Sequence, residues 1–352
     1  MAGLMPLYQW KPHGFLGGLR LAIGRCLAVW TPVALAGPEA YQSKPRHEVF
    51  MPNPSTEIDQ PSQKTMHLIP GNPIAAGSAP WGVLVDEDNN TAYVCNSDGS
   101  NVLPINTRTR TPGDPIQLAH SPELAVLNKR THTLYTLSFD GYVMPIDTRT
   151  NEAGTPVSVE GGSPRAATQN IVLNQKQDLL YVADYYGGKI YIIDPKSGQQ
   201  TPDSPIVLSV NPQDIEIDEA NDTLYVLYVV SDSSNAGYVI PISTNSPDPE
   251  VDPIAVGYAP SVMVLDKVNR YLYISNNDRK ITTLFTPTNT VDIGAIDHGG
   301  LNMAAMAVDE GFQILYVAGS DESAQRRGRV VIFRADIGKV DGSVSVGDLP
   351  NG

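Results

Sequence analysis

The sequence has few of the cysteines that disulfide-bonded folds need and no apolar run of the length that membrane-spanning helices need. It holds two cysteines, Cys26 and Cys95, too few for a disulfide framework. Its longest apolar run, residues 26–36, is too short to cross a bilayer as a helix. Cys95 lies within an alternating strand pattern, which indicates a buried small hydrophobe and not a reactive thiol.

Helical periodicity and familiar catalytic motifs are also missing. No segment of about a dozen residues repeats its apolar positions with a helical period. The chain contains no His-Glu-x-x-His, no Gly-x-Ser-x-Gly and no glycine pattern for nucleotides. The sequence therefore predicts no catalytic residues and favours a protein that is not an enzyme.

Basic residues are scarce as well. The chain has 24 Lys and Arg against 38 Asp and Glu, for a net charge of -14. Such a surface repels phosphate backbones and anionic lipid surfaces, so we expect no nucleic-acid partner.

The N-terminus has the order of a secretory signal peptide. Arg20 and Arg25 precede the apolar run 26–36, which closes on Ala34-Leu35-Ala36. We expect residues 1–36 to be a signal peptide and 37–72 a linker or irregular extension. Because Arg25 interrupts the apolar stretch, a disordered leader is the alternative for residues 1–36. This predicts a periplasmic, cell-surface or secreted protein.

The rest of the chain is repetitive. A tyrosine within a short apolar run recurs at intervals of 42, 46, 44, 48 and 43 residues, and an Asp or Asn stands seven residues before each one. The tyrosines are Tyr93, Tyr135, Tyr181, Tyr225, Tyr273 and Tyr316, and the preceding residues are Asp86, Asn128, Asn174, Asp218, Asp266 and Asp309. A Pro-Ile or Pro-Val pair recurs at 73–74, 115–116, 156–157, 205–206 and 253–254.

Each unit holds four short apolar runs, which is the pattern of a four-stranded propeller blade. The sequence thus predicts an all-β fold, with a β-propeller over residues 73–352. We expect the recurrent Asp or Asn to form the turn between the first and second strands of each blade, because short polar side chains bond their own backbone there.

The tyrosine motif also carries a family resemblance. Leu-Tyr-Val-Ala-Asp at 180–184 and Tyr-Val-Cys-Asn at 93–96 resemble the YVTN-type β-propeller repeat. The resemblance implies a fold like that of the cytochrome-d1 and lactonase propellers, and it names no function, because this repeat serves binding proteins and enzymes alike.

Two blade counts stay open. Six repeats are visible, and six blades would close if 73–76 served as a shared outer strand. The C-terminal residues 344–352 share the register of 74–82, and Val49-Phe50-Met51-Pro52 imitates a third strand, so a truncated seven-bladed protein is the alternative.

A ligand site is predicted where two sets of loops meet. If the first strand of each blade lines the axis, the loops before that strand and the loops after the tyrosine strand open on one face. The proposed ligand-binding residues are Trp81, Glu123, Arg165, Gln213, Ser261, Asp184 and Tyr186, with Asp98, Asp140, Tyr185, Asn276, Asn277, Asp278 and Met303 in equivalent loops. His120 and His298 fall in corresponding loops of the second and sixth repeats. We interpret them as solvated loop residues, and a base or a metal ligand is the alternative role.

Two functions follow from this pattern. The first is an exported binding or scaffold module for a protein, glycan or small ligand, with no cofactor. The alternative is a lactonase-like hydrolase or lyase, with a divalent metal held by axial carboxylates such as Glu123.

Overall fold

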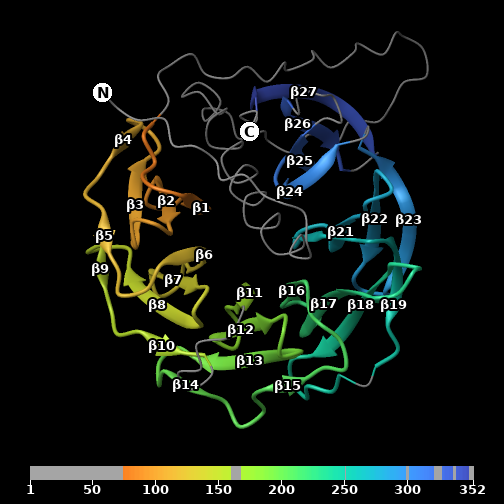
Figure 1. The fold of residues 1–352 in the computed structure, drawn as a ribbon, viewed down its shortest axis with the longest axis horizontal. Coiled ribbons are helices and arrows are strands. Elements are labelled where there is room, and N and C mark those ends of the chain that lie inside the picture. Colours follow the sequence, from red (N-terminus) through yellow and green to blue (C-terminus); the bar gives the residue numbers. More distant parts are fainter. Residues whose placement is uncertain are drawn as a thin grey trace, which may run out of the picture.

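The computed structural model describes residues 74–159, 168–249, 251–298, 301–320, 327–335 and 338–348. Within these ranges the chain contains only strands and turns, arranged as six antiparallel sheets around a common axis (Figure 1). The predicted all-β propeller of four-stranded blades is confirmed, with six blades. Arg165 lies outside the described residues.

Each blade is a meander that runs outward from the axis. The inner strands are β1 (Pro80–Asp86), β6 (Pro122–Asn128), β11 (Thr168–Asn174), β16 (Asp214–Asp218), β20 (Val262–Asp266) and β24 (Asn302–Asp309). The second strands carry the repeated tyrosine and are β2 (Thr91–Asn96), β7 (Thr133–Ser138), β12 (Leu179–Asp184), β17 (Thr223–Val229), β21 (Tyr271–Ser275) and β25 (Ile314–Ser320).

The third and outer strands complete the sheets. The third strands are β3 (Asn101–Asn106), β8 (Tyr142–Asp147), β13 (Lys189–Asp194), β18 (Ala236–Ser243), β22 (Lys280–Phe285) and β26 (Arg327–Arg334). In blades 1 to 3 the outer strand is split into short pairs, namely β4 (Thr111–Pro112) with β5 (Ile116–Gln117), β9 (Glu152–Ala153) with β10 (Val157–Ser158), and β14 (Gln199–Gln200) with β15 (Ile206–Val207). In blades 4 to 6 it is continuous, as β19 (Ile254–Tyr258), β23 (Thr290–Asp297) and β27 (Lys339–Asp348).

The repeated Asp or Asn forms the first turn of its blade, as predicted. Asp218 is buried, and its carboxylate accepts hydrogen bonds from the backbone N–H groups of Ala220 at 3.0 Å and Asn221 at 3.3 Å. The equivalent residue accepts a backbone N–H in each of the other blades. A short polar side chain at this position therefore caps the turn in all six units.

In blades 1 and 4 the repeated tyrosine links its blade to the next one. The Tyr225 hydroxyl, in blade 4, donates to the Thr286 carbonyl at 3.2 Å and lies 3.0 Å from Asn289 Oδ1, both in blade 5. Tyr93 of blade 1 makes the corresponding contact with Thr148 of blade 2 at 3.4 Å. In these two blades the hydroxyl bonds a turn of the next sheet, which Phe could not do. In blade 3 the Tyr181 hydroxyl instead donates to Gln177 Oε1 of its own blade at 3.2 Å.

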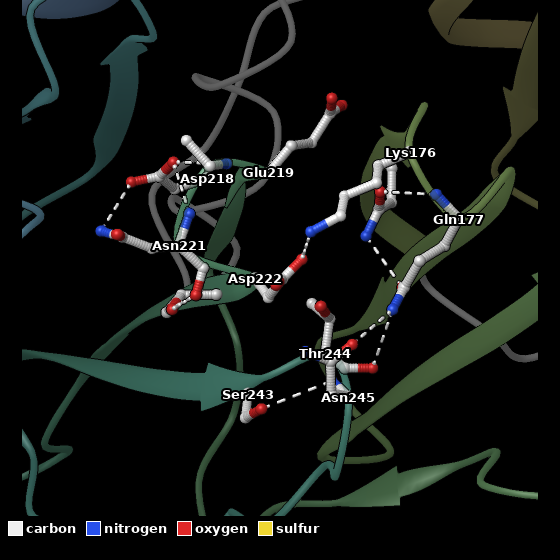
Figure 2. Close-up of polar contacts among 12 residues, drawn as sticks. Lys176, Gln177, Asp218, Glu219, Asn221, Asp222, Ser243, Thr244 and Asn245 are labelled. Atoms are coloured by element: carbon white, nitrogen blue, oxygen red, sulfur yellow. Dashed lines mark hydrogen bonds and ion pairs between the residues drawn. The ribbon is translucent and has the colours of Figure 1, made fainter.

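Ion pairs and amide contacts join neighbouring blades on the side where the first and third turns of each blade gather, which we call the turn face. Figure 2 shows Lys176 Nζ of blade 3 at 2.6 Å from Asp222 Oδ1 of blade 4. Beside it, Gln177 Nε2 donates to Asn245 Oδ1 at 3.1 Å (Figure 2). These contacts join blades 3 and 4 at the surface, where exposed ion pairs contribute little to stability.

Of the two alternatives, closure of six blades by a shared outer strand at 73–76 is wrong for the described residues 74–76. Residues 74–77 do not lie in a strand, and the sixth blade has its own outer strand, β27. Because β26 pairs with β27 along its whole length, its outer edge has no free backbone groups for a second partner. The C-terminal residues 344–348 belong to β27 and complete this blade.

Candidate binding site on the loop face

Two sets of loops meet on the side opposite the turn face, which we call the loop face. It consists of the connections that enter each inner strand and the turns between second and third strands. His120, before β6, lies with Nδ1 2.7 Å from Oδ2 of Asp140, in the turn after β7. Ser121 Oγ is 3.0 Å from Ser100 Oγ, in the turn after β2. The two predicted loop sets thus share one face.

The inner strands line an axial cavity of about 420 Å³. Side chains from all six inner strands contribute, and most are apolar, among them Leu84, Leu124, Val264 and Met306. The walls of the axial cavity are therefore mostly apolar.

A buried carboxylate ties three of these strands together. Asp214 of β16 accepts the backbone N–H of Met263 in β20 at 2.8 Å, and its other oxygen is hydrogen-bonded by Asn170 Nδ2 of β11. Asp214 is fully buried, so these bonds compensate the loss of its hydration. Asp214 therefore joins the inner strands of blades 3, 4 and 5 to one another at the loop-face end of the axis.

The inner strands bulge where they approach the loop face. The register of β6 against β7 gains one residue between Pro122 and Leu124, at Glu123, and that of β1 against β2 shifts between Pro80 and Val83. A bulge redirects the side chain of the extra residue, and such devices occur next to functional sites. Glu123, and Trp81 within the β1 shift, thus occupy irregular positions at the axial end of the loop face.

The two bulged strands approach each other very closely. A Cβ atom at Gly82 would overlap the backbone carbonyl oxygen of Glu123. Only glycine permits this contact, which fixes the position of Glu123 relative to blade 1.

Glu123 has a strongly altered acidity. Burial and, to a smaller extent, the negative charge of Asp140 together raise its pKa from 4.5 to about 7. Near neutral pH this carboxyl group exchanges between protonated and ionised forms, which is uncommon for glutamate and concentrates at functional sites.

A histidine and a tyrosine complete the group. The His120 ring stacks on Tyr142, with ring centroids 3.7 Å apart and planes inclined by 16°. Burial alone would raise the pKa of Asp140, but hydrogen bonds from Ser138 and His120 outweigh it and lower that pKa. We call Glu123, Asp140, His120 and Tyr142 the Glu123 cluster. The cluster brings two carboxyl groups, an imidazole and an aromatic ring together at one place on the loop face.

The remaining predicted site residues are spread over other blades. Gln213 enters β16, and its backbone N–H donates to the Leu227 carbonyl at 2.7 Å. Ser261 Oγ lies 3.0 Å from Ser275 Oγ. Both stand at the loop-face ends of inner strands, like Trp81 and Glu123, but they belong to blades 4 and 5, whereas the Glu123 cluster belongs to blade 2.

Blade 3 contributes two further predicted residues. Asp184 is buried and accepts the Gly187 backbone N–H at 2.9 Å, so it shapes its own turn. Tyr186 is 56% exposed and packs edge-on against Tyr185, with ring centroids 5.1 Å apart. Tyr186 is thus an aromatic surface on the loop face, while Asp184 is a structural residue.

Sequence reasoning missed the central contact of the site. His120 was expected to be solvated, but it stacks on Tyr142 and contacts Asp140. His298 was also expected to be solvated and is instead 2% exposed. The only signal for the cluster was the run Asp140-Gly141-Tyr142 in a turn opposite His120. Within the described ranges, no three His, Cys, Asp or Glu side chains lie close enough to hold a metal ion.

Comparisons with known proteins bear on the fold alone. No family model and no curated protein matches the sequence. Among solved structures, hydrazine synthase of Kuenenia stuttgartiensis is similar, with a TM-score of 0.59 and 16% identity over 81% of this chain and 90% of that chain. In the described part of the chain, no helix has the length and apolar character to span a membrane. In the residues that the structure describes, the chain folds as a β-propeller with six blades.

Proposed function

We propose that this protein is an exported binding or scaffold module that holds its partner on the loop face, at the Glu123 cluster. The partner is a protein, glycan or small ligand that presents a positively charged group. One observation carries the proposal, namely a half-buried glutamate whose pKa is raised to about 7 beside a second carboxylate.

The chemistry of the cluster favours a cation. Repulsion between Glu123 and Asp140 opposes the simultaneous ionisation of both groups. A cation between them would relieve that repulsion, and the aromatic face of Tyr142 adds attraction for the same charge. The net charge of -14 would draw positively charged partners toward the molecule.

A binding measurement with matched variants tests the proposal. The probes are a lysine-rich peptide and a glucosamine oligosaccharide, titrated calorimetrically against the native chain, Glu123→Gln and Asp140→Asn. Glu152→Gln is the control, because it removes the same charge from an exposed position in β9. We expect binding by the native chain and the control, with roughly tenfold weaker binding for either site variant, as for loss of a charge-assisted hydrogen bond.

The proposal also predicts proton release. Binding of a cation near pH 7 should drive Glu123 to its ionised form, so the heat of binding should depend on the ionisation enthalpy of the buffer. Equal affinities for all four proteins, or binding of neither probe, would refute it. Sequencing the N-terminus of the mature protein, with cleavage expected after Ala36, tests export separately.

A second candidate function is a hydrolase or lyase of the lactonase kind. A carboxyl group that titrates near neutral pH suits general acid–base catalysis, and this observation favours Glu123 as the base. Hydrolysis of a simple lactone, measured with and without added calcium or magnesium, would need to disappear in Glu123→Gln. Metal analysis of the purified protein would test whether a divalent ion takes part.

A further inference from the structure

Five interfaces between blades are visible in the described residues. Each is an apolar cluster with members from two consecutive blades, from blades 1 and 2 through blades 5 and 6. The inner strands make matching contacts in the same order, from β1 with β6 to β20 with β24. Among the described residues, no comparable contact joins β24 to β1.

Two further apolar clusters contain residues of one blade only. On blade 1 the cluster is Ala92, Val94, Leu103 and Ile105, and on blade 6 it is Ala305, Tyr316, Ala318, Val330 and Ile332. In each strand these residues alternate with those that face the neighbouring blade, so they form the opposite surfaces of the first and last sheets. We call them the two terminal faces.

The position of Ile74 shows what belongs against the blade 1 terminal face. Ile74 follows a proline, as do Ile116, Val157, Ile206 and Ile254, which all begin outer-strand segments. Ile116 and Leu118 pack in the cluster between blades 1 and 2, and Ile74 and Ala76 pack in the same way on the blade 1 terminal face. Residues 74–76 thus take the place that the outer strand of a preceding blade would take.

The length of chain before residue 74 matches this position. Ile116 follows Pro80, the first residue of its blade, by 36 positions, and the same count back from Ile74 reaches residue 38. The segment 38–73 therefore equals in length residues 80–115 of blade 1, which hold its first three strands and the short segment β4. It includes the run Val49-Phe50-Met51-Pro52, which resembles a third strand.

We propose that residues 38–73 of the same chain pack between the two terminal faces as a seventh, blade-like unit that closes the ring. The apolar run 49–52 contacts the blade 1 and blade 6 terminal faces. A second copy of the chain and an unrelated partner are the competing occupants.

Photo-crosslinking in the full chain distinguishes these occupants. The variant Phe50→p-benzoylphenylalanine is irradiated as a mixture of isotopically light and heavy protein, and the crosslinked peptides are identified by mass spectrometry. We expect crosslinks to 91–106 or 314–334 within one chain, in about tenfold excess over mixed-isotope products, since a tethered segment has a far higher effective concentration than a free copy. Mixed-isotope products in the majority, crosslinks elsewhere, or none at all would overturn the proposal.

A second variant pair tests the same contact without a crosslinker. Phe50→Asp should increase the fluorescence of a hydrophobic dye severalfold, because the terminal faces lose their cover. Phe312→Asp makes the same change at a side chain that is 71% exposed and should leave the signal unchanged. Equal dye binding by the two variants would also overturn the proposal.

Discussion

Replacing Glu123 by glutamine should change how the stability of the protein depends on pH. In the unfolded chain this carboxyl group ionises near its ordinary pKa of 4.5, whereas in the folded protein its pKa is about 7. Between these values the unfolded state loses its proton first. The native protein therefore loses free energy of unfolding as the pH rises from 4.5 through 7, and Glu123→Gln does not.

The magnitude follows from the two pKa values. Each tenfold change in proton affinity corresponds to about 1.4 kcal/mol, so the full interval amounts to about 3 kcal/mol. Because the side chain is only half-buried, water reduces this to roughly 2 kcal/mol. Glu123→Gln should thus gain about 2 kcal/mol relative to the native protein between pH 5 and pH 8.

Urea denaturation followed by circular dichroism measures this difference. Titrations are carried out at pH 5, 6, 7 and 8 on the native chain, Glu123→Gln and the control Glu152→Gln. Subtracting the native free energy of unfolding from that of each variant at the same pH removes the contributions of all other groups. The difference for Glu123→Gln should grow with pH, while that for Glu152→Gln stays flat. A difference for Glu123→Gln that is independent of pH would refute the pKa assignment and the site built on it.

Four further perturbations follow from single contacts. Asp214→Asn should lower the free energy of unfolding by about 2–3 kcal/mol in urea titrations. The amide NH2 group would replace one carboxylate oxygen and would then face a hydrogen-bond donor, such as the Met263 N–H, in place of an acceptor. A change below about 0.5 kcal/mol would contradict the role of that carboxylate. Tyr225→Phe should cost about 1 kcal/mol by the same measurement, and no cost would mean that the hydroxyl does not join blades 4 and 5. Burial lowers the pKa of His298 below 6.5, so the native protein should lose stability as the pH falls below 6.5, whereas His298→Asn should not. Melting temperatures of the two proteins that change in parallel with pH would contradict this. Gly82→Ala should lower the melting temperature by several degrees through overpacking, and an unchanged value would exclude the close approach of β1 to β6.

Local chemistry made the fold predictable. The Asp or Asn seven residues before each tyrosine acts within its own turn, and Asp218 forms the expected bonds to residues only two and three positions away. The tyrosine spacing likewise reflects one complete blade. Closure was not predictable in this way, because whether 74–76 pairs in a strand depends on β26, which is far away in the sequence and already has a partner.

The site was predictable only in its location. Glu123 and Trp81 were predicted as residues of the loops that enter the inner strands, and the structure places both at irregularities near the start of β6 and β1, on the loop face. The contact of His120 with Asp140 could not be predicted from the sequence, since it joins the connection into blade 2 to a turn of that blade 20 positions further along the chain. Whether a loop histidine is solvated or stacked on an aromatic ring depends on how two loops pack against each other, and the composition of either loop does not predict this.

The split outer strands of the first three blades have a consequence for self-association. Segments of two residues offer a foreign strand too few aligned backbone groups for pairing, so this part of the rim resists edge-to-edge addition. The continuous β23 and β27, of 8 and 10 residues, expose long ladders by contrast. Fibril growth or strand donation by another polypeptide should begin on the circumference of blades 5 and 6.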